Sequence, residues 1–165
     1  MPDRIDGMHE QKFIVGGEWR SGRSALDVTD PYSGEKIAAV FQASSEDLED
    51  AVRSAQDAFT VTSQYSSFER ARILNSIAAQ IADRKEEFAH TIMRESGKPS
   101  TFARSEVERA VSTFEIASEE TKRIVGETIP LDLTPSGKGR RAVVEYFPIG
   151  IILAVTPFNR YRAVA

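Results

Sequence analysis

The feature that most constrains the fold is a nearly continuous apolar run, Ile149-Gly-Ile-Ile-Leu-Ala-Val-Thr156. A strand with one face in water alternates apolar and polar side chains, whereas a strand covered on both faces of a parallel sheet does not. We therefore expect residues 149–156 to form a strand buried in a parallel sheet. Parallel neighbours need crossover connections of about a dozen residues or more. Because nine residues follow Thr156, we expect the chain to begin such a sheet without finishing it.

A second interpretation makes this run an antiparallel core strand paired with residues 141–147. Residues 128–133 and 141–147 are themselves predicted to form a long hairpin. The segment between them, Thr134-Pro-Ser-Gly-Lys-Gly139, is rich in turn formers and predicts an irregular connector.

The first forty residues are predicted to be rich in β-structure after a polar leader, residues 1–12. Phe13-Ile-Val-Gly-Gly-Glu-Trp19 is typical of a strand that enters a Gly-Gly turn, and we expect Trp19 to pack or stack. Asp30-Pro-Tyr-Ser-Gly34 has the composition of a turn, and Lys36-Ile-Ala-Ala-Val-Phe41 predicts the returning strand.

Residues 44–125 predict a series of amphipathic helices. A first helix is expected from Ser44 and Ser45, and the capping-box pattern Ser66-x-x-Glu69 begins a second. A third helix is expected to begin in the acid-rich segment 83–87 and to stop at Gly97-Lys-Pro99. Residues 101–125 keep one apolar stripe, and Gly126 is the expected stop.

Composition excludes several classes of chemistry. The chain has 165 residues and no cysteine, so it supplies no disulfide, thiolate ligand or thiol nucleophile. Its two histidines, His9 and His90, are too isolated to indicate a zinc site or a catalytic triad. A net charge of -4 gives no attraction to nucleic acid. No run reaches the roughly 20 apolar residues of a membrane span, and no secretory signal is recognisable, so we expect no membrane partner and a cytoplasmic location.

At Tyr146-Phe-Pro-Ile-Gly-Ile-Ile-Leu-Ala-Val-Thr-Pro-Phe-Asn159 the chain resembles the aldehyde dehydrogenase superfamily. In that family the first strand of the cofactor domain ends in this Pro-(aromatic)-Asn turn. The resemblance continues upstream and covers nearly the whole chain, from about Phe13 to Asn159. Its further matches are Ile14-Val-Gly-Gly-Glu-Trp19, Asp30-Pro-Tyr-Ser-Gly-Glu35, Glu95-Ser-Gly-Lys-Pro99, Glu106-Val107 and Phe114.

The resemblance implies NAD(P)+-dependent oxidation of an aldehyde through a cysteine thiohemiacetal. Asn159 matches the amide that stabilises the oxyanion, and Thr156, Pro157, Phe158 and Asn159 match the turn beside the NAD or NADP cofactor. Glu95 matches an acidic position that lies near a monovalent cation in some members. Taken without the motif, Asn159 is typical of a turn cap, Thr156 to Phe158 of a strand-ending turn, and Glu95 of a solvated last-turn residue.

The end of the chain departs from the family pattern, because Arg160-Tyr-Arg-Ala-Val-Ala165 stands where an apolar residue, Pro and a helix are usual. The cofactor-binding lysine, the glycine turn, the general-base glutamate and the nucleophilic cysteine of the family are all missing. We therefore expect a fragment that is inactive alone.

The resulting prediction is an α/β fold, the amino-terminal part of the aldehyde dehydrogenase fold. It divides into a leader (1–12), the β-rich and helical part of the cofactor domain (13–126), an oligomerisation hairpin (127–148), and the first Rossmann-like strand with a truncated end (149–165). In the family this hairpin belongs to the arm through which subunits associate, which implies a homo-oligomer. The alternative function is a non-catalytic interaction or oligomerisation module. In either interpretation the unpaired strand at residues 149–155 would be an exposed edge that favours self-association.

Overall fold

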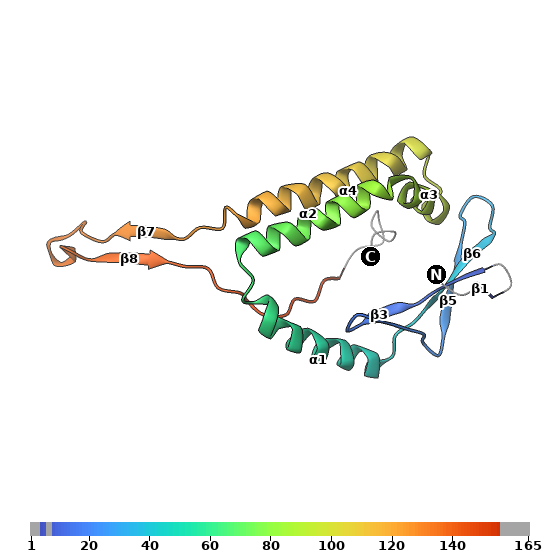
Figure 1. Ribbon diagram of the computed structural model, residues 1–165, viewed down its shortest axis with the longest axis horizontal. Helices are drawn as coiled ribbons and strands as arrows, with labels where there is room; N and C mark the ends of the chain where they lie inside the picture. Colours follow the sequence, from blue (N-terminus) through green and yellow to red (C-terminus); the bar gives the residue numbers. More distant parts are fainter. Residues whose placement is uncertain (1–3, 6–7, 156–165) are drawn as a thin grey trace.

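The computed structural model describes residues 4–5 and 8–155. A β-rich end, a helical middle and a two-stranded arm follow one another along the long axis of the molecule (Figure 1). The fold is mixed α and β, which confirms the predicted class. The elements are β1 (Arg4–Ile5), β2 (Met8–Gln11), β3 (Phe13–Val15), β4 (Glu18–Arg20), β5 (Ala25–Thr29), β6 (Lys36–Phe41), α1 (Ser45–Thr62), α2 (Ser67–Asp83), α3 (Lys85–Ser96), α4 (Ser100–Thr121), β7 (Glu127–Pro130), the 3₁₀ helix η1 (Pro135–Gly137) and β8 (Arg141–Val144).

Part of the polar leader pairs with the sheet, which its sequence did not indicate. The strand order is β1-β2-β6-β5, with β2 parallel to β6 and β5 antiparallel to it. His9 stands opposite Ala38 in the parallel register. Strand preference depends strongly on the neighbouring strand, so the polar composition of residues 8–11 did not predict this pairing.

The β3–β4 hairpin forms at the predicted Gly-Gly turn. Gly16 and Gly17 have φ angles of 61° and 86°, a left-handed backbone that glycine adopts without steric cost. The inner face of the hairpin buries Val15, which is 6% exposed. Trp19 lies on the other face opposite Ile14 and is 67% exposed, so the expectation that it packs is wrong. None of the described residues covers that outer face closely enough to bury the indole.

The helix starts follow the predicted capping signals. Ser44 and Ser66 each accept a hydrogen bond from the backbone N–H three residues on, and Asp47 and Glu69 each accept one from the backbone N–H of the capping serine. These capping boxes satisfy N–H groups that the first helical turn leaves without partners. α3 ends at Ser96 and is capped by Gly97, whose φ of 66° is the left-handed conformation of a C-terminal cap.

The core lies where α2, α3 and α4 meet. α2 and α4 run side by side, with α3 across one end (Figure 1). The buried cluster is entirely apolar and uses the stripe predicted for the long helix, with smaller residues allowing close approach. Its members are Ile81, Ala89, Ile92, Ala103, Val107 and Ala110. α1 contributes no buried residue.

α4 ends at Thr121, before the predicted stop at Gly126. The hydroxyl of Thr121 lies 3.4 Å from the carbonyl oxygen of Ser67, the first residue of α2, so the neighbouring helix ends at this level. Ile124 and Val125 lie beyond it and are 58% and 70% exposed. Without a surface to pack against, their apolar periodicity does not extend the helix.

The arm is the predicted hairpin, with β7 and β8 antiparallel. Its connector is more regular than expected, because residues 135–137 form the 3₁₀ helix η1. Pro135 begins this turn, a position where the missing N–H of proline is not needed.

The apolar run forms no strand within residues 149–155, which corrects the expectation of a buried strand. Ile149, Leu153 and Val155 are more than 80% exposed. The antiparallel alternative is not observed either, because residues 149–155 form no strand and β7 is the strand that pairs with β8 among the described residues. A strand needs a hydrogen-bonded neighbour, and none of the described strands pairs with this segment.

Candidate functional site

The predicted catalytic and cofactor-binding residues, Thr156, Pro157, Phe158 and Asn159, lie outside the described residues. The structure describes the chain as far as Val155. Residues 149–155 run from the base of the arm back toward the helices (Figure 1). Their apolar side chains, which the sequence predicted to lie inside a sheet, are exposed.

The corner between α3 and α4 carries the other residues singled out in the sequence. Gly97 turns the chain there, and its backbone N–H donates to the carbonyl oxygen of Met93 over 2.9 Å. A Cβ at position 97 would stand 3.1 Å from Cγ of Pro31, so the corner lies directly against the turn at residues 30–34. Arg94 adds an ion pair to Glu35 at 3.6 Å. Residues far apart in sequence thus meet at this corner.

The turn facing this corner is held by its own aspartate. Asp30 accepts hydrogen bonds from the backbone N–H groups of Tyr32 at 2.9 Å and Ser33 at 3.2 Å. Both bonds favour the charged carboxylate and lower the pKa of Asp30, with Arg94 adding a weaker electrostatic contribution in the same direction. The arrangement is an Asx turn, which explains locally why Asp-Pro-Tyr-Ser-Gly is a turn sequence.

A buried ion pair lies just beyond the corner. Lys98 donates to Oε1 of Glu106 over 2.7 Å, and Arg109 lies 3.7 Å from the same oxygen. Glu106 is 7% exposed, and its Oε2 has no hydrogen-bond partner among the described residues. Two cations therefore face one carboxylate, which disfavours an additional metal cation at this position. The sequence named Glu106 only within the family match, because no local spacing links it to Lys98.

Glu95 lies in the last turn of α3 and is partly buried. Nowhere in residues 4–5 and 8–155 do three or more His, Cys, Asp or Glu side chains gather in a way that could hold a metal ion. His90 is exposed on α3. The cation site suggested for Glu95 by the family resemblance therefore stays a prediction.

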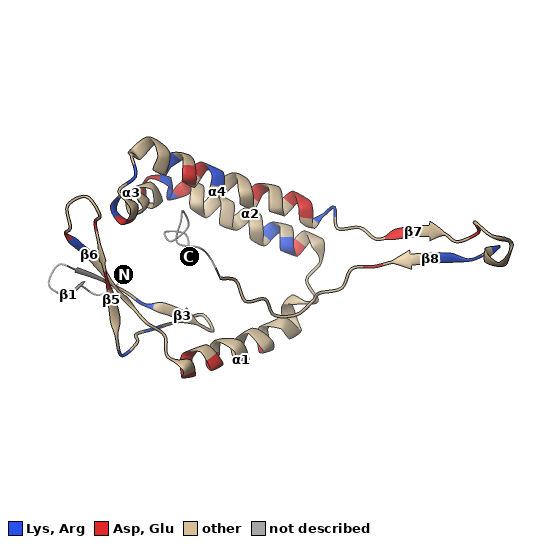
Figure 2. Ribbon diagram, turned by 180° about the vertical axis from the view of Figure 1, so that it is seen from behind, with Lys and Arg blue, Asp and Glu red and all other residues tan. Residues whose placement is uncertain are grey.

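Charged residues also attach the β3–β4 hairpin to α1. Arg20 bridges Asp50 at 2.7 Å and Asp47 at 3.2 Å. The Arg20 bond is the main cause that lowers the pKa of Asp50, whereas the pKa of Asp47 is lowered first by its capping bond with Ser44. Figure 2 shows acidic residues at the start of α1 and basic residues at the tip of the arm.

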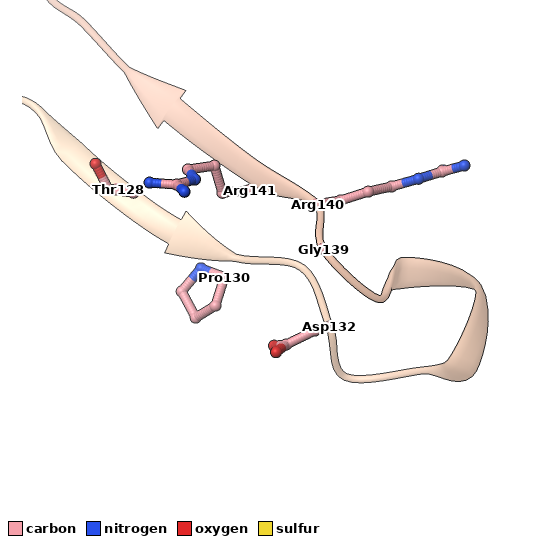
Figure 3. Close-up of a pocket in the computed structure, with 6 residues that line it drawn as sticks. All are labelled: Thr128, Pro130, Asp132, Gly139, Arg140 and Arg141. Atoms are coloured by element: carbon pink, nitrogen blue, oxygen red, sulfur yellow. The ribbon is translucent and has the colours of Figure 1, made fainter.

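A shallow cavity of about 280 Å³ opens beside the arm. Its lining residues are Thr128, Pro130, Asp132, Gly139, Arg140 and Arg141. Figure 3 shows Arg140 pointing away from the hairpin, whereas Arg141 lies across toward Thr128. The polar groups do not converge on a common point, as they do in a cofactor pocket.

Over the described ranges, none of the helices combines the length and the apolar character needed to cross a bilayer.

Comparison with known proteins gives one consistent family. The family model described as "Aldehyde dehydrogenase family" matches residues 19–163. The 3-sulfolactaldehyde dehydrogenase of Priestia megaterium is 38% identical over 147 residues, which are 89% of this chain and 30% of the relative. The mitochondrial succinate-semialdehyde dehydrogenase of Arabidopsis thaliana is 33% identical over 158 residues, or 94% of this chain and 29% of that protein.

Solved structures agree with the sequence matches. The NADP-dependent glyceraldehyde-3-phosphate dehydrogenase of Bacillus halodurans, solved with NADP, superposes with a TM-score of 0.86 at 30% identity. The match covers 93% of this chain and 33% of that one. Aldehyde dehydrogenase 21 of Physcomitrella patens gives a TM-score of 0.77 at 36% identity, covering 82% and 28%. The chain thus spans about 30% of the length of the curated relatives.

Proposed function

The chain belongs to the aldehyde dehydrogenase family, and we propose that it is the amino-terminal part of an enzyme that oxidises an aldehyde to a carboxylic acid with NAD+ or NADP+. Relatives of both cofactor preferences support the choice, since one is an NADP-dependent enzyme and another an NAD-dependent benzaldehyde dehydrogenase. The observation that carries the proposal is the family match continuing through the Thr156-Pro-Phe-Asn159 turn.

The described residues do not by themselves fit a dinucleotide. Residues 149–155, which would support the cofactor turn, have no neighbouring strand, and the cavity beside the arm lacks convergent polar groups. We therefore assign the cofactor to the parent enzyme, where Thr156, Pro157 and Phe158 would contribute one wall.

Asn159 is the residue of this chain that we propose acts on the substrate. Addition of a nucleophile to an aldehyde puts negative charge on the former carbonyl oxygen, and a fixed side-chain amide stabilises that oxygen by donating a hydrogen bond. The chain contains no cysteine to serve as the nucleophile. We therefore expect no aldehyde oxidation by the 165 residues alone.

The encoding DNA should first be read past the codon for Ala165 in all three frames. The longest continuous product should then be assayed by aldehyde-dependent NAD(P)H fluorescence. In that product we expect Asn159→Ala to lower kcat by about 10²–10³-fold. Asn75→Ala is the matched control, because Asn75 is an exposed amide on α2. Aldehyde oxidation by the 165-residue chain itself would overturn the proposed division of roles.

Cofactor binding can be measured on the chain as it stands. We expect calorimetry to detect no binding of NAD+ or NADP+ and thermal shift to detect no stabilisation by either cofactor. The reason is that residues 156–158, which would form one wall of the cofactor site, lack the neighbouring strands of the parent enzyme. Stabilisation at micromolar cofactor would contradict this, and would show that the chain completes a binding surface unaided.

A second candidate function is association between copies of the chain through the arm. The observation that favours it is the exposure of apolar side chains on a ribbon that projects away from the core: Val143 is 63% exposed, Tyr146 72% and Phe147 78%. Exposed apolar surface of this kind is typical of interfaces. Light scattering at tens of micromolar tests this proposal, and a clean monomer would contradict it.

A further inference from the structure

The two outer edges of the arm are not equivalent. The backbone N–H of Leu131 donates to the carbonyl oxygen of Arg140 over 3.1 Å. Hydrogen-bonded and non-hydrogen-bonded pairs alternate along an antiparallel ladder, so the register Ile129–Ala142 and Glu127–Val144 continues the bonded pairs. The residues between them turn their backbone N–H and C=O groups outward. On β7 these are Thr128 and Pro130, and on β8 they are Arg141 and Val143.

Pro130 closes one of these edges to strand pairing. Proline has no N–H, so the outer edge of β7 lacks one of the donors that a neighbouring strand would need. The outer edge of β8 keeps the N–H and C=O groups of both Arg141 and Val143. The same alternation makes Glu145 the next outward residue. β8 therefore presents the open edge of this ribbon.

We propose that β8 pairs antiparallel with β8 of a second copy of the chain, about a two-fold axis centred on Val143. This proposal rests on the proposed association through the arm. It adds which strand edge forms the pair and which residues stand opposite each other. The two-fold axis of a symmetric pair can pass through a hydrogen-bonded pair of outward residues, which are Arg141, Val143 and Glu145. It can also pass through a non-hydrogen-bonded pair of the residues between them, Ala142 or Val144.

Charge decides among these centres. Centring on Ala142 or Val144 places neither Arg141 nor Glu145 opposite a charged residue. Centring on Arg141 would place two guanidinium groups opposite each other, and centring on Glu145 would place two carboxylates together. Centring on Val143 instead places Arg141 opposite Glu145 of the second copy, twice in the dimer. Opposite charges directly across a pair of strands stabilise it, whereas like charges destabilise it.

The neighbouring positions agree with the same register. On the other face it places Ala142 opposite Val144 and, one step further, Arg140 opposite Tyr146 of the second copy. A guanidinium against an aromatic ring is a favourable contact, and Tyr146 is 72% exposed in the single chain. The dimer would contain the strand order β7-β8-β8-β7, which turns two marginal two-stranded ribbons into one four-stranded sheet.

Charge reversal tests the register by sedimentation equilibrium of the full chain. We expect Arg141→Glu and Glu145→Arg each to weaken the dimer by about tenfold or more, because each creates two like-charge pairs. The double variant R141E/E145R should restore it. All variants should also be made in a Leu153→Lys background, since Leu153 is 82% exposed in the separate apolar segment 149–155.

Two further measurements test the edge. Val143→Pro removes an outward donor and should abolish the dimer, whereas Thr128→Pro at the opposite edge should leave it intact. Val143→Cys gives the chain a single cysteine. Two copies in the proposed register place these residues about 5.5 Å apart between Cα atoms, within the range of a disulfide. Thr128→Cys is the matched control and should not cross-link.

The outcomes separate the two proposals. A dimer that is insensitive to Arg141→Glu and Val143→Pro would overturn the β8 register and leave association by another surface. A monomeric chain in every background would overturn both, and would mean that the β8 edge is occupied by a strand from elsewhere in the parent enzyme.

Discussion

Ser118 on α4 donates its hydroxyl to the carbonyl oxygen of Ala71 on α2 over 3.0 Å, and both residues are buried. This bond joins α4 to α2 near the start of α2. A small hydroxyl residue is needed there, because Ser118 has no exposed surface and the facing residue is alanine.

Ser118→Val should lower the free energy of unfolding by about 1–3 kcal/mol, because one additional methyl-sized group must enter a closed contact and the hydrogen bond to Ala71 is lost. Ser118→Ala should have a smaller effect, about 0.5–1.5 kcal/mol, from the lost hydrogen bond. Urea denaturation followed by circular dichroism measures both. The matched control is Ser112→Ala on the exposed face of α4, expected to change stability by about 0.5 kcal/mol or less. Equal effects at positions 112 and 118 would contradict the proposed contact.

Gly97→Ala should destabilise the chain by about 1–2 kcal/mol, because an L-residue is strained at a φ of 66°. The added Cβ would also press on Pro31. Pro31→Ala separates these causes: in the P31A background the penalty of Gly97→Ala should become smaller without vanishing. Thermal unfolding of the four proteins gives the comparison. No change on Gly97→Ala would show that the corner is not held in this conformation.

Lys98→Met should destabilise the chain by about 1–3 kcal/mol, because it leaves the buried Glu106 carboxylate with Arg109 as its nearest cation. The double variant Lys98→Met/Glu106→Met should recover much of the loss, since it removes the unpaired charge as well. A double-mutant cycle from urea denaturation measures the coupling. Additive effects of the two single substitutions would rule out this pairing. Lys122→Met, which breaks an exposed pair with Glu119, is the control.

Acid should loosen the attachment of the β3–β4 hairpin to α1. The pKa values of Asp47 and Asp50 are lowered in the folded chain, so their contribution is fully present above the unfolded value near 3.9 and is lost as pH falls through the folded values. Arg20→Gln should therefore reduce the dependence of the unfolding midpoint on pH below about 4. Salt near 1 M should shrink the difference, because it screens exposed pairs. An unchanged pH profile in Arg20→Gln, compared with Arg123→Gln as control, would contradict this.

The parts of the fold predicted from sequence are those decided by nearby residues. The capping boxes at Ser44 and Ser66 and the Gly16-Gly17 turn each satisfy their backbone groups within a few positions, so their patterns are sufficient. The parallel pairing of β2 with β6 and the end of α4 depend on distant partners, and both differ from expectation.

The candidate site divides in the same way. The turn at residues 156–159 came from resemblance to a family, and it remains a prediction outside the described residues. The Lys98–Glu106 pair was not predicted. The two residues are eight positions apart with the start of α4 between them, and this separation matches no regular side-chain spacing. The apolar run at 149–155 was identified as a buried-type strand, yet a strand forms only beside a partner.

The absence of buried residues in α1 has a consequence for amide hydrogen exchange. Amides exchange through local opening wherever little packing opposes it, and through global unfolding where the core must separate. α1 should therefore lose its protection in openings that leave α2 and α4 intact. The slowest amides should cluster around Ala103 and Val107. Hydrogen exchange should therefore show two levels of protection among the four helices, a low one in α1 and a high one in α2 and α4.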